Sequence, residues 1–193
     1  MKAILISIKP KWCAKIMNKE KTIEVRKGAA LYKATKKLID EYGFADFYVY
    51  CTKALPLIRY IDENIMFLSC STNTIKNERE SGKYLNGKVV FKFRCYKVER
   101  THEYAGNLLK DSCLTIDEFC DYLGDKIYVY AIHISDLEIF DKPKELSEFK
   151  VKKTYICKNC PPKYQYGACS KDCTEILSLT KAPQSWCYVE ADQ

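Results

Sequence analysis

The feature that most constrains the fold is the run KVVFKFRCYKV, residues Lys88–Val98, in which apolar and charged side chains alternate. Successive side chains of a β-strand point to opposite faces of a sheet, so this alternation predicts a strand with one buried and one solvated face. Such a strand needs neighbouring strands and a core beneath it. Its apolar residues are Val89, Phe91, Phe93 and Cys95, and its charged residues are Lys88, Lys92 and Arg94.

Further β-rich runs and two helical patterns surround this strand. Pro10 can open a helix over Lys11–Lys19, because the N–H that proline lacks would have no partner in the first helical turn. A second helix is predicted over residues 114–123, where Thr115 and Glu118 form a capping box. The other predicted strands are Ala3–Ile8, Lys21–Val25, Asp46–Thr52 and Ile127–Ser135. This order predicts an α+β fold, a small mixed β-barrel with flanking helices, rather than a doubly wound sheet.

Charge and hydropathy bear on the expected location of the protein in the cell and on its partners. The chain has 193 residues and a formal net charge of +7, which permits attraction to phosphate without requiring it. No apolar run approaches the roughly 18–20 residues that cross a bilayer. The first residues, MKAILISIKPKW, lack the small-residue cleavage site of a signal peptide. We therefore expect a cytoplasmic protein that does not span a membrane.

Cysteines are unusually frequent, with eleven in the chain. In the cytoplasm, clustered cysteines indicate metal binding or reduced thiols rather than a disulfide framework. Cys157, Cys160, Cys169 and Cys173 form two close pairs with a short loop between them, which can close a tetrahedral Zn²⁺ site of the structural type. Unliganded thiols are the alternative. We expect a domain over residues 1–150 and a Cys-rich extension over 151–193, with zinc as the candidate structural cofactor.

Charged residues also gather in the short run NKEKTIEVRK, Asn18–Lys27. On a strand, Glu24 and Arg26 share one face, and Lys21 lies at the entry to that strand. If this face lines a cleft, the three charges must pair, since an isolated buried charge is very costly. The alternative is a surface strand whose charges are solvated.

The N-terminal run ILISIKPKWCAKIMNKEKTIEVRK resembles the opening of ASCH domains, which belong to the PUA-like superfamily. The family pattern is a strand, a Lys-Pro turn, a helix and a strand of the form N/G-x-K-T-x-E-x-R. Later runs, including FYVYCTK and GKVVFKFRCYKV, resemble the remaining barrel strands, so the resemblance covers residues 1–150. The tail ending in PQSWCYVE is similar to that of ASCH-like proteins of phages and gut Firmicutes. The residues that match the opening pattern are Lys9, Pro10, Ile16, Lys21, Thr22, Glu24 and Arg26.

This resemblance implies a β-barrel with a cleft that binds RNA or a nucleotide-like ligand. One branch of the family hydrolyses N4-acylated cytidine, with a lysine that corresponds to Lys21 and a nucleophilic threonine where this chain has Glu24. The threonine mechanism therefore does not transfer, although a carboxylate can act as a general base on water. Some other members of the family are ribonucleases that use lysines and a hydroxyl in the same cleft, so the resemblance also implies that activity as an alternative.

Several further residues are candidates for the same cleft. Lys9 precedes Pro10 and should lie near its mouth, and Thr52 and Lys53 follow a strand at a barrel end. Trp186 is our candidate for stacking on a base. His133 is expected to be a hydrogen-bonded structural residue rather than a catalytic one.

Three functional classes follow. The first is an RNA- or nucleotide-binding protein whose ligand contacts Lys9, Lys21, Glu24 and Arg26. The second is a hydrolase of the same fold, a ribonuclease or an amidohydrolase on a modified nucleobase, with Glu24 as base and Lys21 as acid. The third is a phage-encoded protein that binds a protein partner through the polar excursion over residues 54–87.

Overall fold

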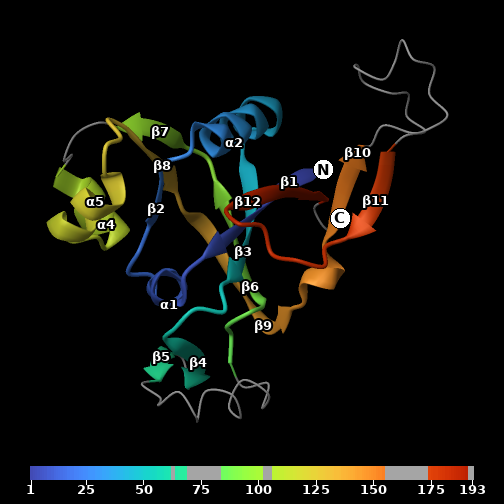
Figure 1. Cartoon of the computed structure of the whole chain (residues 1–193), viewed down its shortest axis with the longest axis horizontal. Coiled ribbons are helices and arrows are strands. Elements are labelled where there is room, and N and C mark those ends of the chain that lie inside the picture. The colour runs from blue at the N-terminus through green and yellow to red at the C-terminus, as the bar shows by residue number, and fades with distance from the viewer. Residues whose placement is uncertain (62–63, 69–83, 102–105, 155–173, 191–193) are drawn as a thin grey trace.

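The computed structural model describes residues 1–61, 64–68, 84–101, 106–154 and 174–190 (Figure 1). These residues form a mixed α+β architecture, as the sequence predicts. Their strands are arranged in a five-stranded sheet, a three-stranded sheet and two two-stranded sheets.

The five-stranded sheet forms the centre of the molecule, with the strand order β12-β1-β3-β6-β9. β1 runs parallel to β3, and the other neighbours are antiparallel. One face packs on α1 and α2, and the other packs on Phe149 and the segments around it. Burial on both faces explains why the first strand is an almost continuous apolar run. The strands are β1 (Lys2–Ile8), β3 (Ala45–Cys51), β6 (Val89–Cys95), β9 (Ser135–Lys144) and β12 (Trp186–Glu190).

The three-stranded sheet is built from β2 (Ile23–Arg26), β8 (Val129–His133) and β7 (Val98–Thr101), in that order. β7 follows β6 after two residues, and β8 leads through Ile134 into β9. The pairing of β6 with β9 therefore continues as the pairing of β7 with β8. Arg94 lies opposite Ser135 in the first pair of strands, and Val98 lies opposite Ile132 in the second. The two sheets are the halves of one bent ribbon.

These sheets do not close into the barrel that the sequence led us to expect. Within the described residues, β12 and β2 are the end strands of this ribbon, and no strand ladder joins them. An open seam therefore lies between β2 and the end of β1 that extends beyond its pairing with β12. The mixed α+β prediction is confirmed, while the closed barrel is not found. The barrel stays open because side chains and a pocket, rather than backbone hydrogen bonds between strands, fill the space at the seam.

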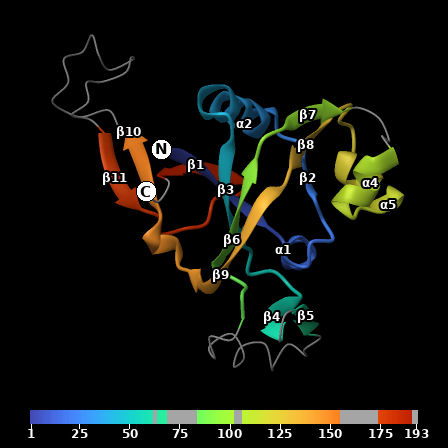
Figure 2. The ribbon, with the colours of Figure 1, turned by 180° about the vertical axis from the view of Figure 1, so that it is seen from behind.

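Four α-helices flank the sheets in the described ranges. α1 (Pro10–Met17) and α2 (Ala29–Tyr42) pack on the core. α1 lies between β1 and β2 in the chain, and α2 lies between β2 and β3. α4 (Gly106–Ser112) and α5 (Ile116–Leu123) cover the outer face of the three-stranded sheet (Figure 2). The capping box predicted at the start of α5 is present, since the Thr115 hydroxyl accepts from the Glu118 backbone and the Glu118 side chain accepts from the Thr115 backbone.

The remaining elements lie at the periphery. Part of the predicted excursion over residues 54–87 forms a hairpin, and residues 62–63 and 69–83 of it lie outside the described residues. No described helix is long and apolar enough to cross a membrane. Residues 186–190, which the sequence analysis placed in the Cys-rich extension, form β12 at the edge of the central sheet. The peripheral elements are β4 (Leu57–Ile61), β5 (Asn64–Leu68), η1 (Leu146–Glu148), β10 (Lys150–Thr154) and β11 (Thr174–Ser178).

The alternation in β6 predicts an asymmetric response to mutation. Phe93 is 1% exposed and stacks on Phe47 with 4.8 Å between ring centroids, whereas Lys92 pairs with Glu138 at the surface. We expect Phe93→Ala to lower the free energy of unfolding by about 3–5 kcal/mol and Lys92→Ala by less than about 1 kcal/mol. Urea denaturation followed by circular dichroism measures both, and equal losses would contradict the assignment of faces.

Candidate functional site

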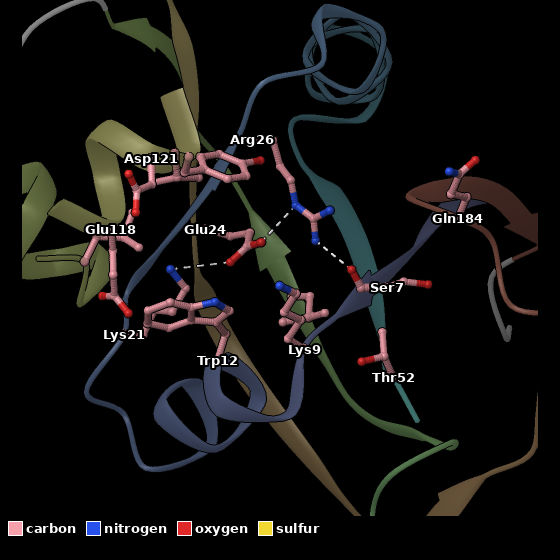
Figure 3. Close-up of a pocket in the computed structure, with 14 residues that line it drawn as sticks. Ser7, Lys9, Trp12, Lys21, Glu24, Arg26, Thr52, Glu118, Asp121 and Gln184 are labelled. Atoms are coloured by element: carbon pink, nitrogen blue, oxygen red, sulfur yellow. Dashed lines mark hydrogen bonds and ion pairs between the residues drawn. The ribbon is translucent and has the colours of Figure 1, made fainter. Parts of the chain in front are cut away.

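A pocket of about 480 Å³ lies at the seam between β1 and β2 (Figure 3). The end of β1 and the start of α1 form one side, β2 forms the floor, and α5 forms the opposite side. Its volume is in the range of small-molecule sites in proteins. The lining residues are Ser7, Ile8, Lys9, Trp12, Lys21, Glu24, Val25, Arg26, Thr52, Leu114, Glu118, Asp121, Tyr122 and Gln184.

The floor of the pocket is an ion-paired network centred on Glu24. Its Oε1 accepts from Arg26 Nε at 2.8 Å, and its Oε2 lies 3.4 Å from Lys21 Nζ. Lys21 is 3% exposed and Glu24 is 5% exposed, so the pair is almost wholly removed from water. One carboxylate is thus shared by two cations, and the floor carries a net positive charge.

Backbone carbonyls complete this network. Arg26 Nη2 donates to the Ser7 carbonyl of β1 at 2.8 Å, just beyond the last residue pair between β1 and β12. Lys21 Nζ donates to the Ser112 carbonyl at the end of α4 at 2.9 Å. A cation is favourable there because a helix presents unsatisfied carbonyls at its C-terminus. The side chains of Arg26 and Lys21 therefore tie β2 to β1 and to α4.

The strand period explains why these residues meet. Glu24 and Arg26 share the pocket face of β2, while Ile23 and Val25 alternate with them and join the apolar cluster under α4 and α5. Lys21 enters from the turn before β2, and its Nζ lies 5.2 Å from the ring centroid of Trp12. A cation held over an indole face gains a further attraction.

Burial dominates the protonation of Lys21. Loss of solvent lowers the pKa of its ammonium group, and the carboxylate of Glu24 acts in the opposite direction. Because the lowering by burial is the larger effect, the pKa of Lys21 lies below its ordinary value. The site therefore holds a lysine that is closer to giving up its proton than an exposed lysine is.

Three charged side chains line the rim of the pocket, outside the network of the floor. Glu118 pairs with Lys11, which anchors α5 to α1. For Lys9 and Asp121, which are both exposed, no side-chain partner is found within the part of the chain that the structure describes. Thr52 also lines the pocket, and its Oγ1 is buried without a hydrogen-bond partner. Lys9, Asp121 and Thr52 are therefore polar groups of the pocket with hydrogen-bonding capacity that no described contact uses.

The structure brings together five of the predicted ligand residues, Lys9, Lys21, Glu24, Arg26 and Thr52. The other two do not line the pocket. Lys53 is exposed, and Trp186 is half-buried in β12 against Tyr188 and the core.

Sequence reasoning missed the contributions of α1 and α5. Trp12 lies at the pocket next to Lys21, although nothing in the helical pattern of Lys11–Lys19 indicates a ligand site there. Glu118, Asp121 and Tyr122 belong to α5, which follows β2 by some 90 residues in the chain. No local sequence pattern indicates that α5 lies next to β2 in the fold. His133 behaves as predicted, since its Nε2 is hydrogen-bonded to Glu99 Oε1 at 2.8 Å.

The predicted zinc ligands Cys157, Cys160, Cys169 and Cys173 lie outside the described residues. Across the ranges that are described, no group of three or more His, Cys, Asp or Glu side chains is placed to hold a metal ion. The zinc site remains a prediction.

Comparison with known proteins bears on the fold. No protein-family model and no curated protein matches the chain. Among solved structures, the ASCH protein of Zymomonas mobilis matches with 13% identity and a TM-score of 0.51, over 97% of this chain and 87% of that one. A serine-to-alanine mutant of the same protein matches with 12% identity and a TM-score of 0.50, over 97% and 88%. The chain therefore has the fold of ASCH proteins, as the resemblance implied.

The shared carboxylate predicts an order of stability losses. Glu24→Gln leaves two cations without their common anion, so we expect the free energy of unfolding to fall by about 3–5 kcal/mol. Lys21→Met leaves the Glu24–Arg26 pair intact and should cost less. Glu20→Gln is the matched control, because Glu20 pairs with Lys15 at the surface and should contribute below about 1 kcal/mol. Urea denaturation of the three variants tests the order; Glu24→Gln no worse than Glu20→Gln would refute it.

A pH dependence follows from the lowered pKa of Lys21. Between the folded-state pKa and the higher unfolded-state pKa, the unfolded chain binds more protons, so the free energy of unfolding rises with pH. Relative to Lys21→Met, the wild-type protein should gain stability as the pH rises from neutrality toward 10.5, the ordinary lysine pKa. The measurement is the difference between the two unfolding free energies at several pH values. A flat or falling difference would show that burial does not control this lysine.

Proposed function

We propose that the pocket at the seam binds RNA or a nucleotide-like ligand. The observation that carries the proposal is the combination, in one cavity, of a net positive floor, a Lys9 that has no partner among the described residues, and the aromatic side chains Trp12 and Tyr122. Phosphate is attracted by the cations, and aromatic rings can stack on a base of any sequence. The ASCH-like fold is compatible with this role and does not by itself establish it.

The network on the floor limits which residues can bind phosphate. Arg26 already donates to Glu24 and to the Ser7 carbonyl, and Lys21 donates to the Ser112 carbonyl. A phosphate that bound either cation directly would have to compete with these buried contacts. Lys9 has no such commitment within the described structure, so we assign the first phosphate contact to Lys9 and a supporting long-range attraction to the floor.

The hydroxyl of Thr52 offers a second contact. An unsatisfied buried hydroxyl costs about 1–3 kcal/mol. A ligand oxygen or nitrogen that reached Thr52 Oγ1 after a small rotation of the side chain would recover part of this cost. The pocket therefore contains a polar group whose free energy improves when a ligand is present.

Binding can be measured through Trp12. The chain has two tryptophans, and Trp186→Phe removes the one that does not line the pocket. In that background, titration with CMP should change the fluorescence of Trp12. Adding Lys9→Ala should weaken binding about fivefold to tenfold, because one charge-assisted contact to phosphate is lost.

The control is Lys33→Ala, which removes one exposed lysine from α2 outside this pocket. It should leave the affinity within about twofold. Equal weakening by both variants would mean that general electrostatic attraction, and not the pocket, accounts for binding. Absence of binding by the parent protein would overturn the proposal.

One specific observation supports the alternative hypothesis that the protein is a hydrolase. Lys21 has a lowered pKa and lies 3.4 Å from the carboxylate of Glu24, a pairing suited to proton transfer. For an acylated amino group on a base, Glu24 would take a proton from water as the water oxygen bonds to the acyl carbon. The C–N bond would then break, and Lys21 would give its proton to the leaving nitrogen. A carboxylic acid and a free amine are the products.

Turnover separates the enzyme from the binding protein. If the site is catalytic, hydrolysis of N4-acetylcytidine or of single-stranded RNA should fall at least about a hundredfold in Glu24→Gln, since general base catalysis contributes about 10²–10⁴ in rate. The assay is run at a temperature at which circular dichroism shows the variant to be folded. Binding without turnover by the wild-type protein would reject the hydrolase for these substrates.

A further inference from the structure

Asp121 is a carboxylate on an anchored helix, and its charge has no partner in the part of the chain that the structure describes. α5 is held by its capping box, by the buried ring of Phe119 and by the ion pair between Glu118 and Lys11. The next residue, Tyr122, lies under Lys27, with 4.8 Å between Nζ and the ring centroid. Asp121 therefore lines the pocket from a well-anchored helix, and it is an acceptor without a partner within the described structure.

Lys9 and Asp121 lie on different sides of the Glu24 carboxylate (Figure 3). Lys9 precedes α1, whereas Asp121 belongs to α5, and Trp12 lines the pocket from α1. A ligand that satisfies both rim charges must present an anion at one end and a hydrogen-bond donor at the other. A nucleotide with an amino group on its base has this arrangement.

The chemistry of a carboxylate makes this contact selective. An ionised carboxylate only accepts hydrogen bonds, so it favours an exocyclic amino group and disfavours a carbonyl oxygen at the same place. Carboxylates recognise the amino group of cytosine in this way. A site built around a polar contact also discriminates strongly against an analogue that lacks the matching group.

We propose that Asp121 is a specificity-determining residue that selects nucleotides whose base carries an exocyclic amino group. This inference rests on the proposed binding of nucleotides in the same pocket. Phosphate binds on the Lys9 side, and the amino group donates to Asp121 on the α5 side. The Glu24 network lies between them and supplies attraction without surrendering its own contacts.

The test uses matched nucleotide pairs and the Trp12 signal in the Trp186→Phe background. CMP and UMP differ by an amino or a carbonyl group at position 4, and AMP and IMP by the same groups at position 6. The parent should bind CMP at least about tenfold more tightly than UMP, and AMP more tightly than IMP. Asp121→Asn offers both a donor and an acceptor, so it should reduce each preference to within about twofold. Asp117→Asn, an exposed position on α5 outside the pocket, is the control and should retain both preferences.

The outcomes distinguish failure of the Asp121 assignment from failure of the proposed nucleotide binding. If CMP and UMP bind the parent equally, or if Asp121→Asn keeps the preference for the amino bases, the assignment of Asp121 is wrong while nucleotide binding stands. If Asp117→Asn loses the preference as Asp121→Asn does, the effect belongs to α5 as a whole and the assignment is also wrong. If none of the four nucleotides binds, the proposed function fails, and this inference fails with it.

Discussion

Glu24 is the residue on which the architecture of the pocket depends, because it is the buried anion that the buried Lys21 and the partly buried Arg26 share. Through Arg26 it fixes the distance between β2 and the Ser7 carbonyl of β1, and through Lys21 it connects to the end of α4. No backbone ladder crosses this seam within the described residues. A buried charge without a partner is strongly unfavourable, so loss of Glu24 would leave both cations without their shared anion, whereas loss of Lys21 would leave the Glu24–Arg26 pair in place. The seam stays open as a pocket because it is held by side chains and not by a strand pair.

This arrangement divides the polar residues of the site into two groups. Lys21, Glu24 and Arg26 satisfy one another, and under the proposed function their net charge would act on a ligand from beneath. Lys9, Thr52 and Asp121 retain unused polar capacity among the described contacts and lie where a ligand would meet them. Specificity should therefore follow the second group, and stability and protonation should follow the first. This division is consistent with a binding site and also with a hydrolase. In a hydrolase, the second group would hold the substrate close to Lys21, whose lowered pKa would suit proton transfer.

Much of the fold could be predicted because the relevant signals are local. The alternation in Lys88–Val98, the proline at the start of α1 and the capping box of α5 each depend on residues within one or two turns or one strand. Glu24 and Arg26 were predicted to share a face because the strand period fixes that relation. The open seam could not be predicted in the same way, because it depends on whether Arg26 contacts a backbone carbonyl nineteen residues away.

Trp186 and Asp121 illustrate what remains out of reach. Trp186 has the composition of a stacking residue, yet the antiparallel pairing of β12 with β1 turns it toward Tyr188 and the core. Asp121 reads as an ordinary solvated residue on a polar helix face, and its place at the pocket depends on how Phe119 docks α5 onto the three-stranded sheet. Both outcomes are set by tertiary contacts between segments that are distant in sequence.

A crystal structure of the protein soaked with CMP would test the central claim most directly. The account predicts density for the nucleotide in the pocket, with its phosphate at Lys9, its base in contact with Trp12, and the Glu24–Arg26 pair still formed beneath it. Density on the exposed lysines of α2 instead, with the pocket empty, would contradict the claim that the seam between β1 and β2 is the ligand site.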